Sequence, residues 1–160
     1  MKLMLSLLAA FVMFFQSSDL EALRDSYAVA NQSKENAKNF IEIADKKTSS
    51  DPVVSGYKAA AKVLEAKVST EGKRKALVKS GATSLESLIK SNPNNTELRL
   101  IRLSVQENVP KIVGYHKNLK EDKEFVLNNY SKQNAALKSY IKKFAAQSKT
   151  MTAAEKATLK

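Results

Sequence analysis

The only histidine in this 160-residue chain, His116, is the first side chain to test for chemistry. Imidazole transfers protons near neutral pH and binds transition metals, but one histidine cannot build a multi-histidine metal site. A Ser-His-Asp arrangement would need partners that the sequence does not place beside it. His116 follows Gly114 and Tyr115 in the least helical part of the chain. We therefore predict a loop-packing or surface role for His116, with Tyr115 anchoring the loop to the body.

Glu121 and Glu124 lie one helical turn apart, with Asp122 between them, in an acidic cluster of an otherwise basic region. Carboxylates at i and i+3 share a helix face, so this pair could bind a divalent cation or transfer protons. Acidic side chains also suit the first turn of a helix, where the helix dipole stabilises them. Three lysines lie within reach and are expected to neutralise the cluster: Lys117, Lys120 and Lys123. We therefore predict that the cluster begins a helix and holds no metal.

Two runs of basic side chains are candidate anion-binding residues. They are Lys73, Arg74 and Lys75 in one run and Lys138, Lys142 and Lys143 in the other. Lys138 and Lys142 have the i, i+4 spacing of neighbours on a helix, a repulsive pair that a binding role would explain. A solvated, lysine-rich surface is the competing interpretation. The chain has four arginines and no tryptophan, so it has few of the guanidinium and aromatic groups that bind nucleic acid. Nucleic acid is therefore not an expected partner.

The net charge of +11 is concentrated toward the C-terminus, where residues 125–160 carry seven basic side chains and one acidic one. A basic surface attracts polyanions and raises association rates, but it does not determine a fold. Cysteine is absent, which excludes thiol nucleophiles and thiolate metal sites. The chain also lacks a glycine-rich phosphate loop, a zinc motif and a nucleophile elbow. We predict no catalytic residue, no metal and no cofactor.

The N-terminal segment has the pattern of a secretory signal peptide. Lys2 precedes an apolar run over residues 3–15, and polarity returns at Gln16. As a helix the run would span about 20 Å, short of the roughly 30 Å of bilayer hydrocarbon. We predict a cleaved signal peptide over residues 1–17, with the mature chain beginning between Gln16 and Asp19. No A-x-A cleavage triplet is present, and an uncleaved interfacial anchor is the alternative.

Apolar residues recur at helical spacing through the rest of the chain, and glycine and proline are few. This period of three to four residues predicts amphipathic helices rather than strands. Helices are expected over residues 20–30, 33–46, 52–68, 71–91, 98–109, 119–130 and 133–147. The predicted fold class is all-α, with about seven antiparallel helices packed as helical hairpins. We expect one helical domain over residues 18–149, with residues 150–160 a short frayed C-terminal helix or tail.

Several local signals support these boundaries. Ser18 with Glu21, and Thr152 with Glu155, have the spacing of a capping box, and Asp51 before a proline predicts a helix N-cap. In the third helix a strict three–four spacing predicts one buried face: Val54, Tyr57, Ala61, Leu64 and Val68. Gly81 costs about 1 kcal/mol against alanine inside a helix. A close helix crossing and a bend are equally good explanations of it.

Residues 81–105 resemble part of a tetratricopeptide repeat. Gly81, Leu85 and Leu88 precede Pro93 at the spacing of that repeat's second helix, and residues 92–95 resemble its inter-repeat turn. Arg99 stands where the next repeat has a large aromatic residue, and no matching repeat lies one period earlier. The resemblance implies stacked helical hairpins, either as a tetratricopeptide-like stack or as an irregular bundle.

A wider resemblance joins four features: the signal peptide, the segment Gly56-Tyr57-Lys58-Ala59, the Asn-Pro-Asn-Asn turn and the run from Ile101 to Lys123. Together they are similar to a group of exported helical proteins from Bacteroidetes-type bacteria. The resemblance implies the periplasm or the cell exterior and lends no chemistry. We therefore expect a non-catalytic interaction module that offers a groove between helices to a peptide or protein. The alternative is a binder of anionic envelope surfaces, lipid head groups or acidic polysaccharide, through the basic C-terminal third.

Overall fold

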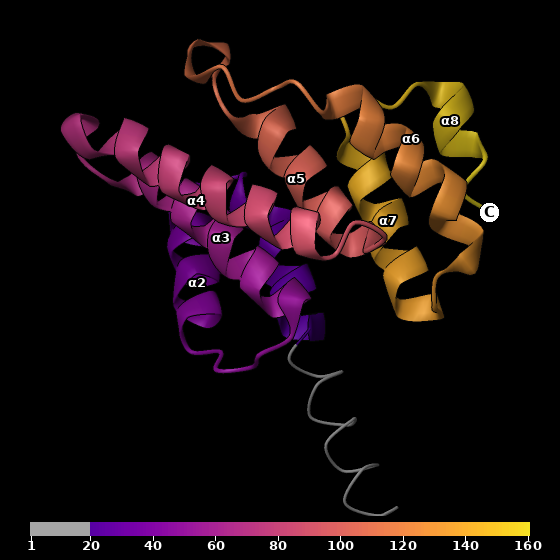
Figure 1. Cartoon of the computed structure of the whole chain (residues 1–160), viewed down its shortest axis with the longest axis horizontal. Helices are drawn as coiled ribbons and strands as arrows, with labels where there is room; N and C mark the ends of the chain where they lie inside the picture. The colour runs from indigo at the N-terminus through magenta and orange to yellow at the C-terminus, as the bar shows by residue number, and fades with distance from the viewer. Residues whose placement is uncertain (1–19) are drawn as a thin grey trace, which may run out of the picture.

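The computed structural model describes residues 20–160, and within that range the fold is all-α, with no strand (Figure 1). Residues 20–30 form the first described helix. The later elements are α2 (Lys34–Asp45), α3 (Pro52–Val68), α4 (Glu71–Ser91), α5 (Thr96–Asn108), η1 (Lys111–Val113), α6 (Leu119–Asn129), η2 (Tyr130–Lys132), α7 (Ala135–Gln147) and α8 (Ala153–Ala157). The predicted fold class is confirmed. The predicted signal peptide and the capping residue Ser18 lie outside the described residues.

Short side chains fix where the helices begin. Asp51 accepts a hydrogen bond from the backbone N–H of Val53 at 2.7 Å, with a proline at the first helical position of α3. Asn95 of the predicted turn caps α5 by accepting from two backbone N–H groups. Thr152 and Glu155 form the predicted capping box of α8. These bonds satisfy backbone groups that a helix start leaves unpaired.

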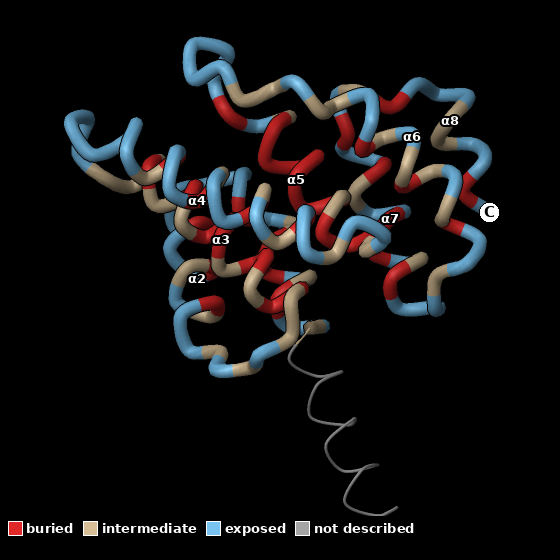
Figure 2. Tube along the Cα trace, in the orientation of Figure 1, coloured by how far each residue is buried: buried red, intermediate tan, exposed pale blue. Residues whose placement is uncertain are grey.

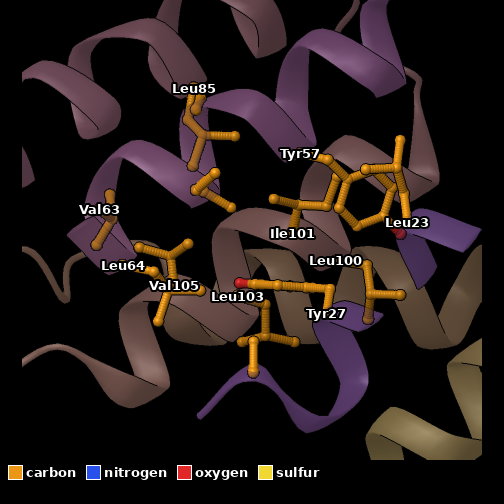
Figure 3. Packing of buried hydrophobic residues seen from close by; sticks show 14 of the residues in the cluster. Leu23, Tyr27, Tyr57, Val63, Leu64, Leu85, Leu100, Ile101, Leu103 and Val105 are labelled. Atoms are coloured by element: carbon orange, nitrogen blue, oxygen red, sulfur yellow. The ribbon is translucent and has the colours of Figure 1, made fainter. Parts of the chain in front are cut away.

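The third helix, α3, lies at the centre of the N-terminal half and contacts α2, α4 and α5. Four of the five residues predicted to face inward are buried, and Val68 is half-buried. Further buried residues lie on other faces of α3: Val53, Gly56, Ala59, Ala60, Val63 and Ala66. The single buried face predicted from the spacing is therefore incomplete, because neighbours surround this small-residue helix on several sides. Figure 3 shows Tyr57 of α3 packed near Leu23 and Ile101.

Gly81 marks the close crossing of α3 and α4. A Cβ atom at Gly81 would lie 2.5 Å from the carbonyl oxygen of Ala59 and 2.6 Å from Cγ2 of Val63. Both contacts are far shorter than van der Waals distance, so no side chain fits at this position. Of the two explanations of this glycine, the close crossing is the correct one.

The fifth helix, α5, is buried along most of its length (Figure 2), because α3 and α4 pack on it from one side and α6 from the other. Its buried face includes polar residues that bind partners on neighbouring helices. Glu97 accepts two hydrogen bonds from the Arg24 guanidinium, at 2.6 and 2.7 Å, and a third from the Tyr57 hydroxyl at 2.8 Å. This buried network ties the first described helix and α3 to α5.

The C-terminal helices α6, α7 and α8 gather at the end of the molecule opposite the α3–α4 turn (Figure 1). Residues 150–160 pack on the body through the buried side chains of Met151 and Leu159. The Tyr130 hydroxyl donates a hydrogen bond to the carbonyl oxygen of Lys160 at 3.1 Å. Over residues 20–160, no helix is both long and apolar enough to cross a bilayer.

Candidate binding groove

A groove of about 930 Å³ lies between the α3–α4 hairpin and the segment that follows α5. Its floor is apolar and comes from the three helices α3, α4 and α5 and from the segment after α5. The floor residues are Ala60, Val63, Leu64, Val78, Val105 and Val109. Figure 3 shows Val63, Leu64 and Val105 close together at this part of the core. The floor is thus an extension of the hydrophobic core toward the surface.

One wall of the groove, the segment Pro110–Gly114, presents apolar side chains to solvent. Ile112 is 96% exposed and Val113 is 37% exposed, and both line the groove. The short 3-10 helix η1 ends at Gly114, whose φ of 73° is left-handed and suits glycine. The gap between the helices predicted over residues 98–109 and 119–130 is confirmed, and η1 is the short helical turn within it. Its turn holds Ile112 outside the core, beyond the end of α5.

The residues that follow Gly114 fasten this wall to the body. The Tyr115 hydroxyl donates a hydrogen bond to a carboxylate oxygen of Glu86 on α4 at 2.8 Å. Burial, and then this contact with Glu86, raise the pKa of Tyr115 well above its ordinary value. His116 Nε2 lies 3.0 Å from the carbonyl oxygen of Val109. The anchoring role predicted for Tyr115 and the loop-packing role predicted for His116 match these contacts.

Four cationic side chains border the groove: Lys67, Arg74, Lys75 and Lys149. The Lys67 ammonium donates to the carbonyl oxygen of Asn31 at 2.6 Å, and Arg74 Nε lies 3.4 Å from the carbonyl oxygen of Ser69. Within residues 20–160, none of the four forms an ion pair with a carboxylate. Glu71 is the one acidic side chain in the lining. The rim is therefore positive, and its four cations have no carboxylate partner within the described residues.

Lys149 reaches the rim because Glu107, near the end of α5, holds the chain beyond α7. Glu107 accepts hydrogen bonds from the Ser148 hydroxyl at 2.6 Å and from the Lys149 backbone N–H at 3.1 Å. The Lys149 ammonium in turn donates to Asn108 Oδ1 at 2.8 Å and to the Glu107 carbonyl oxygen at 3.2 Å. Cations are stabilised at the C-terminal end of a helix. The position of this charge is thus fixed by the fold.

Tyr27 contributes the aromatic side chain of the lining. It packs against Phe40 with a centroid distance of 4.9 Å. Burial raises the pKa of Tyr27 to about 12, so the phenol stays neutral at physiological pH. This side chain is buried and borders the groove as a neutral, mainly apolar group.

The two predicted basic runs lie in different places. Arg74 and Lys75 line the groove, whereas Lys73 is exposed outside it. The second run is on α7, toward the opposite end of the molecule from the α3–α4 turn (Figure 1). There the Lys138 ammonium lies 5.7 Å from the Tyr130 ring centroid, Lys142 is exposed, and Lys143 pairs with Asp25 at 3.0 Å. The structure does not bring these two runs together.

The acidic cluster begins α6, as predicted, but the lysines expected to neutralise it are not its main partners. Arg102 on α5 donates two hydrogen bonds to the fully buried Asp122, at 2.6 and 2.7 Å. Arg99 binds both Asp122 and Glu121. The predicted lysine neutralisation is wrong for Glu121 and Asp122, because the packing of α5 against α6 places two guanidinium groups beside them. It holds for Glu124, which Lys120 approaches. The hydrogen bond from Asn118, and then Arg99, lower the pKa of Glu121.

Two of the three lysines near that turn pair with other carboxylates, Glu124 and Glu155. Lys120 lies 3.8 Å from Glu124, and both side chains are mostly exposed. Lys123 pairs with Glu155 of α8 at 2.7 Å, and this contact and the capping box lower the pKa of Glu155 to about 2. In the described part of the chain, no three histidine or acidic side chains group as a metal site.

Several groove residues do not follow from the sequence alone. Lys67 and Lys149 are far apart along the chain, and no local signal predicts that they border one groove with Arg74. Ile112 and Val113 did carry a signal, because two adjacent β-branched apolar residues in an irregular, proline- and glycine-bounded segment have no helix face to cover them.

No family model, curated protein or solved structure matches this chain. The resemblances to tetratricopeptide repeats and to exported Bacteroidetes-type proteins therefore stay predictions. The groove combines an apolar floor, an exposed apolar wall and a positive rim.

Proposed function

We propose that this protein is a non-catalytic, exported interaction module that binds a segment of a peptide or protein partner in the groove. The observation that carries the proposal is the nearly complete exposure of Ile112 beside an apolar floor. Apolar side chains at such positions, next to a concave surface, are typical of recognition sites. The Tyr115–Glu86 hydrogen bond supports a preformed wall, which lowers the entropic cost of binding.

The energetic contribution of the wall is appreciable. Transferring an exposed isoleucine side chain out of water stabilises a complex by about 1.5–3 kcal/mol. Burial of the neighbouring valine would add to this. A partner that covers Ile112 and reaches the floor would therefore gain affinity from apolar contact before any polar contact is counted.

Export belongs to the same proposal and is supported by the N-terminal sequence pattern. Lys2, the apolar run over residues 3–15 and the polar boundary are typical of a signal peptide. We infer that the protein acts in the periplasm or outside the cell, so its partner is an envelope or extracellular protein. The absence of cysteine suits an oxidising compartment, because no thiol is available for unwanted disulfides.

Affinity capture from the native envelope tests the proposal with two matched variants. Val113 in the groove wall and Val29 outside the groove are each 37% exposed, so Val113→Gln and Val29→Gln change equal surface. We expect Val113→Gln to capture less partner than wild type, and Val113→Gln combined with Ile112→Gln to lose the partner at least about tenfold, the equivalent of 1.4 kcal/mol. Val29→Gln should capture as much as wild type. Equal capture by Val113→Gln and Val29→Gln would contradict the proposal.

The alternative function, binding of anionic surfaces by α7, is tested with Lys138→Glu, Lys142→Glu and Lys143→Glu together. Two of these lysines already contact Tyr130 and Asp25, which argues against a free binding surface. We expect wild type to sediment only weakly with anionic vesicles, and the triple change to have little effect on envelope capture. Strong vesicle binding that falls steeply between about 50 and 200 mM salt, and that the triple change abolishes, would favour the alternative.

A further inference from the structure

We propose that the segment bound in the groove is an acidic amphipathic helix, whose apolar face contacts the floor and Ile112 and whose carboxylates pair with the rim. This inference rests on the proposed function and adds the chemistry of the partner. It follows from three observations: the sign of the rim, the absence of ion-pair partners for its charges within residues 20–160, and the absence of a strand edge in the described part of the chain.

The rim selects for negative charge. Lys67, Arg74, Lys75 and Lys149 border the groove, and Glu71 is the one carboxylate among the lining residues. Lys67, Arg74 and Lys149 contact backbone carbonyl oxygens, Lys149 also binds the Asn108 side chain, and Lys75 is exposed. None of the four has an ion-pair partner within residues 20–160. A basic side chain that already has a carboxylate partner gains little from a second one. These four therefore remain available to carboxylates of a bound segment.

The cations of the groove come from three different elements. Arg74 lies on the first turn of α4, whereas Lys149 follows α7 and is held at the end of α5 by Asn108. Lys67 lies at the last turn of α3. Carboxylates at several positions along an amphipathic helix would thus find cations on different elements that line the groove.

The walls favour a helix over an extended strand. In the described residues there is no sheet, so a bound peptide has no strand edge to extend. The lining contains one aromatic residue, Tyr27, whereas grooves that bind polyproline segments are lined by several. An apolar trough between helices is the site in which amphipathic helices bind through residues at i, i+3, i+4 and i+7.

A second copy of this chain does not suit the groove. The net charge of the chain is +11, and the rim of each copy would bring further positive charge against the other. Like charges at close range oppose association. An acidic partner instead neutralises both the rim and part of the net charge.

Fluorescence anisotropy with three matched peptides tests the inference on the purified protein. Each peptide has about 18 residues, roughly 27 Å as a helix, with leucine on one face. The other face carries glutamate, glutamine or lysine. We expect the glutamate peptide to bind at least about tenfold more tightly than the glutamine peptide, and the lysine peptide to bind more weakly still. Ile112→Gln should weaken the glutamate and glutamine peptides alike.

The charge effect is localised by a matched pair of double variants. Arg74→Gln with Lys75→Gln removes two rim charges, and Lys73→Gln with Lys142→Gln removes two exposed charges outside the groove. We expect the first pair to weaken the glutamate peptide about three- to tenfold and to leave the glutamine peptide unchanged. The second pair should change neither peptide. Equal losses from both pairs would mean a general charge effect and would overturn the inference.

Three other outcomes also overturn it. Equal affinity for the glutamate and glutamine peptides would reject an acidic partner. If Ile112→Gln still weakened both peptides, the groove would remain an apolar binding site. No binding of any peptide at about 1 mM would reject the helical occupant, and envelope capture would still decide the proposed function. Displacement of the glutamate peptide by phosphatidylglycerol vesicles, through Arg74 and Lys75, would assign the rim to a membrane surface.

Discussion

Three of the four arginines in this chain bind carboxylates inside the protein. Arg24 binds Glu97, and Arg99 and Arg102 bind Asp122. Their planar forks suit such bidentate pairs, whereas lysine predominates on the surface. The scarcity of arginine argued against nucleic-acid binding on sequence grounds, and the internal partners of these three strengthen that argument. Arg74 is the one arginine left at the groove.

The pair between Arg102 and Asp122 predicts a large effect from a single change. Asp122→Ala should reduce the free energy of unfolding by about 3–5 kcal/mol, because it removes the buried carboxylate shared by Arg99 and Arg102 and leaves the nearly buried Arg102 with only the partly exposed Glu86. Glu124→Ala on the same helix removes only an exposed pair with Lys120 and should cost less than about 0.5 kcal/mol. Urea titrations measure both values. Similar losses from the two variants would show that Asp122 is not the buried partner described here.

At the scale of elements, the α3–α4 hairpin depends on the absence of a side chain at Gly81. The carbonyl oxygen of Ala59 and the backbone nitrogen of Val63 approach this position, and neither is the end of a flexible side chain. The backbone of α3 therefore has to move if a Cβ atom is added. The helices α3 and α4 also supply much of the groove floor, so a shift of this crossing would move floor residues.

Alanine at two glycines of α4 should act in opposite directions. Gly81→Ala should lower the free energy of unfolding by about 1–3 kcal/mol, because overpacking outweighs the gain of up to about 1 kcal/mol in helix propensity. Gly72→Ala meets no atom within 4 Å and should be neutral or stabilise by up to about 1 kcal/mol. Chemical unfolding of both variants checks the pair. Stabilisation by Gly81→Ala would contradict the close crossing.

The sequence predicted the elements well where the signal was local. Asp51 before a proline, the Asn-Pro-Asn-Asn turn and the capping box of Thr152 each act within a few residues, and each is confirmed. The surroundings of α3 were only partly predicted, since small residues such as Ala59 and Ala60 carry little periodic signal. Their burial depends on which helices pack nearby.

The groove could not be predicted as a site for the same reason. The sequence indicated Arg74 and Lys75 as part of a basic run. Only the fold brings Lys149 and Ile112 to the groove that these two residues line. The basic run on α7 lies away from the α3–α4 turn, so the two runs do not meet (Figure 1). Long-range packing, which one sequence does not encode in any local pattern, decides which charges meet.

At the scale of the whole molecule, the charges of the surface differ from the charges of the groove. Most of the lysines keep a protein of net charge +11 solvated, and such a charge raises association rates with polyanions. The groove combines a subset of these charges with apolar area, a combination that can orient a ligand. We therefore propose that a partner protein covers Ile112.

Site-specific photo-crosslinking in the native envelope tests that claim most directly. A benzophenone side chain replaces Ile112 in one variant and Val29 in another, both among the exposed large apolar residues. A third variant carries it in place of Lys142 on α7, which is also exposed. The account predicts a covalent adduct with one partner protein from position 112, and several-fold less or none from positions 29 and 142. Equal adducts from all three positions, or adducts from position 142 alone, would contradict it.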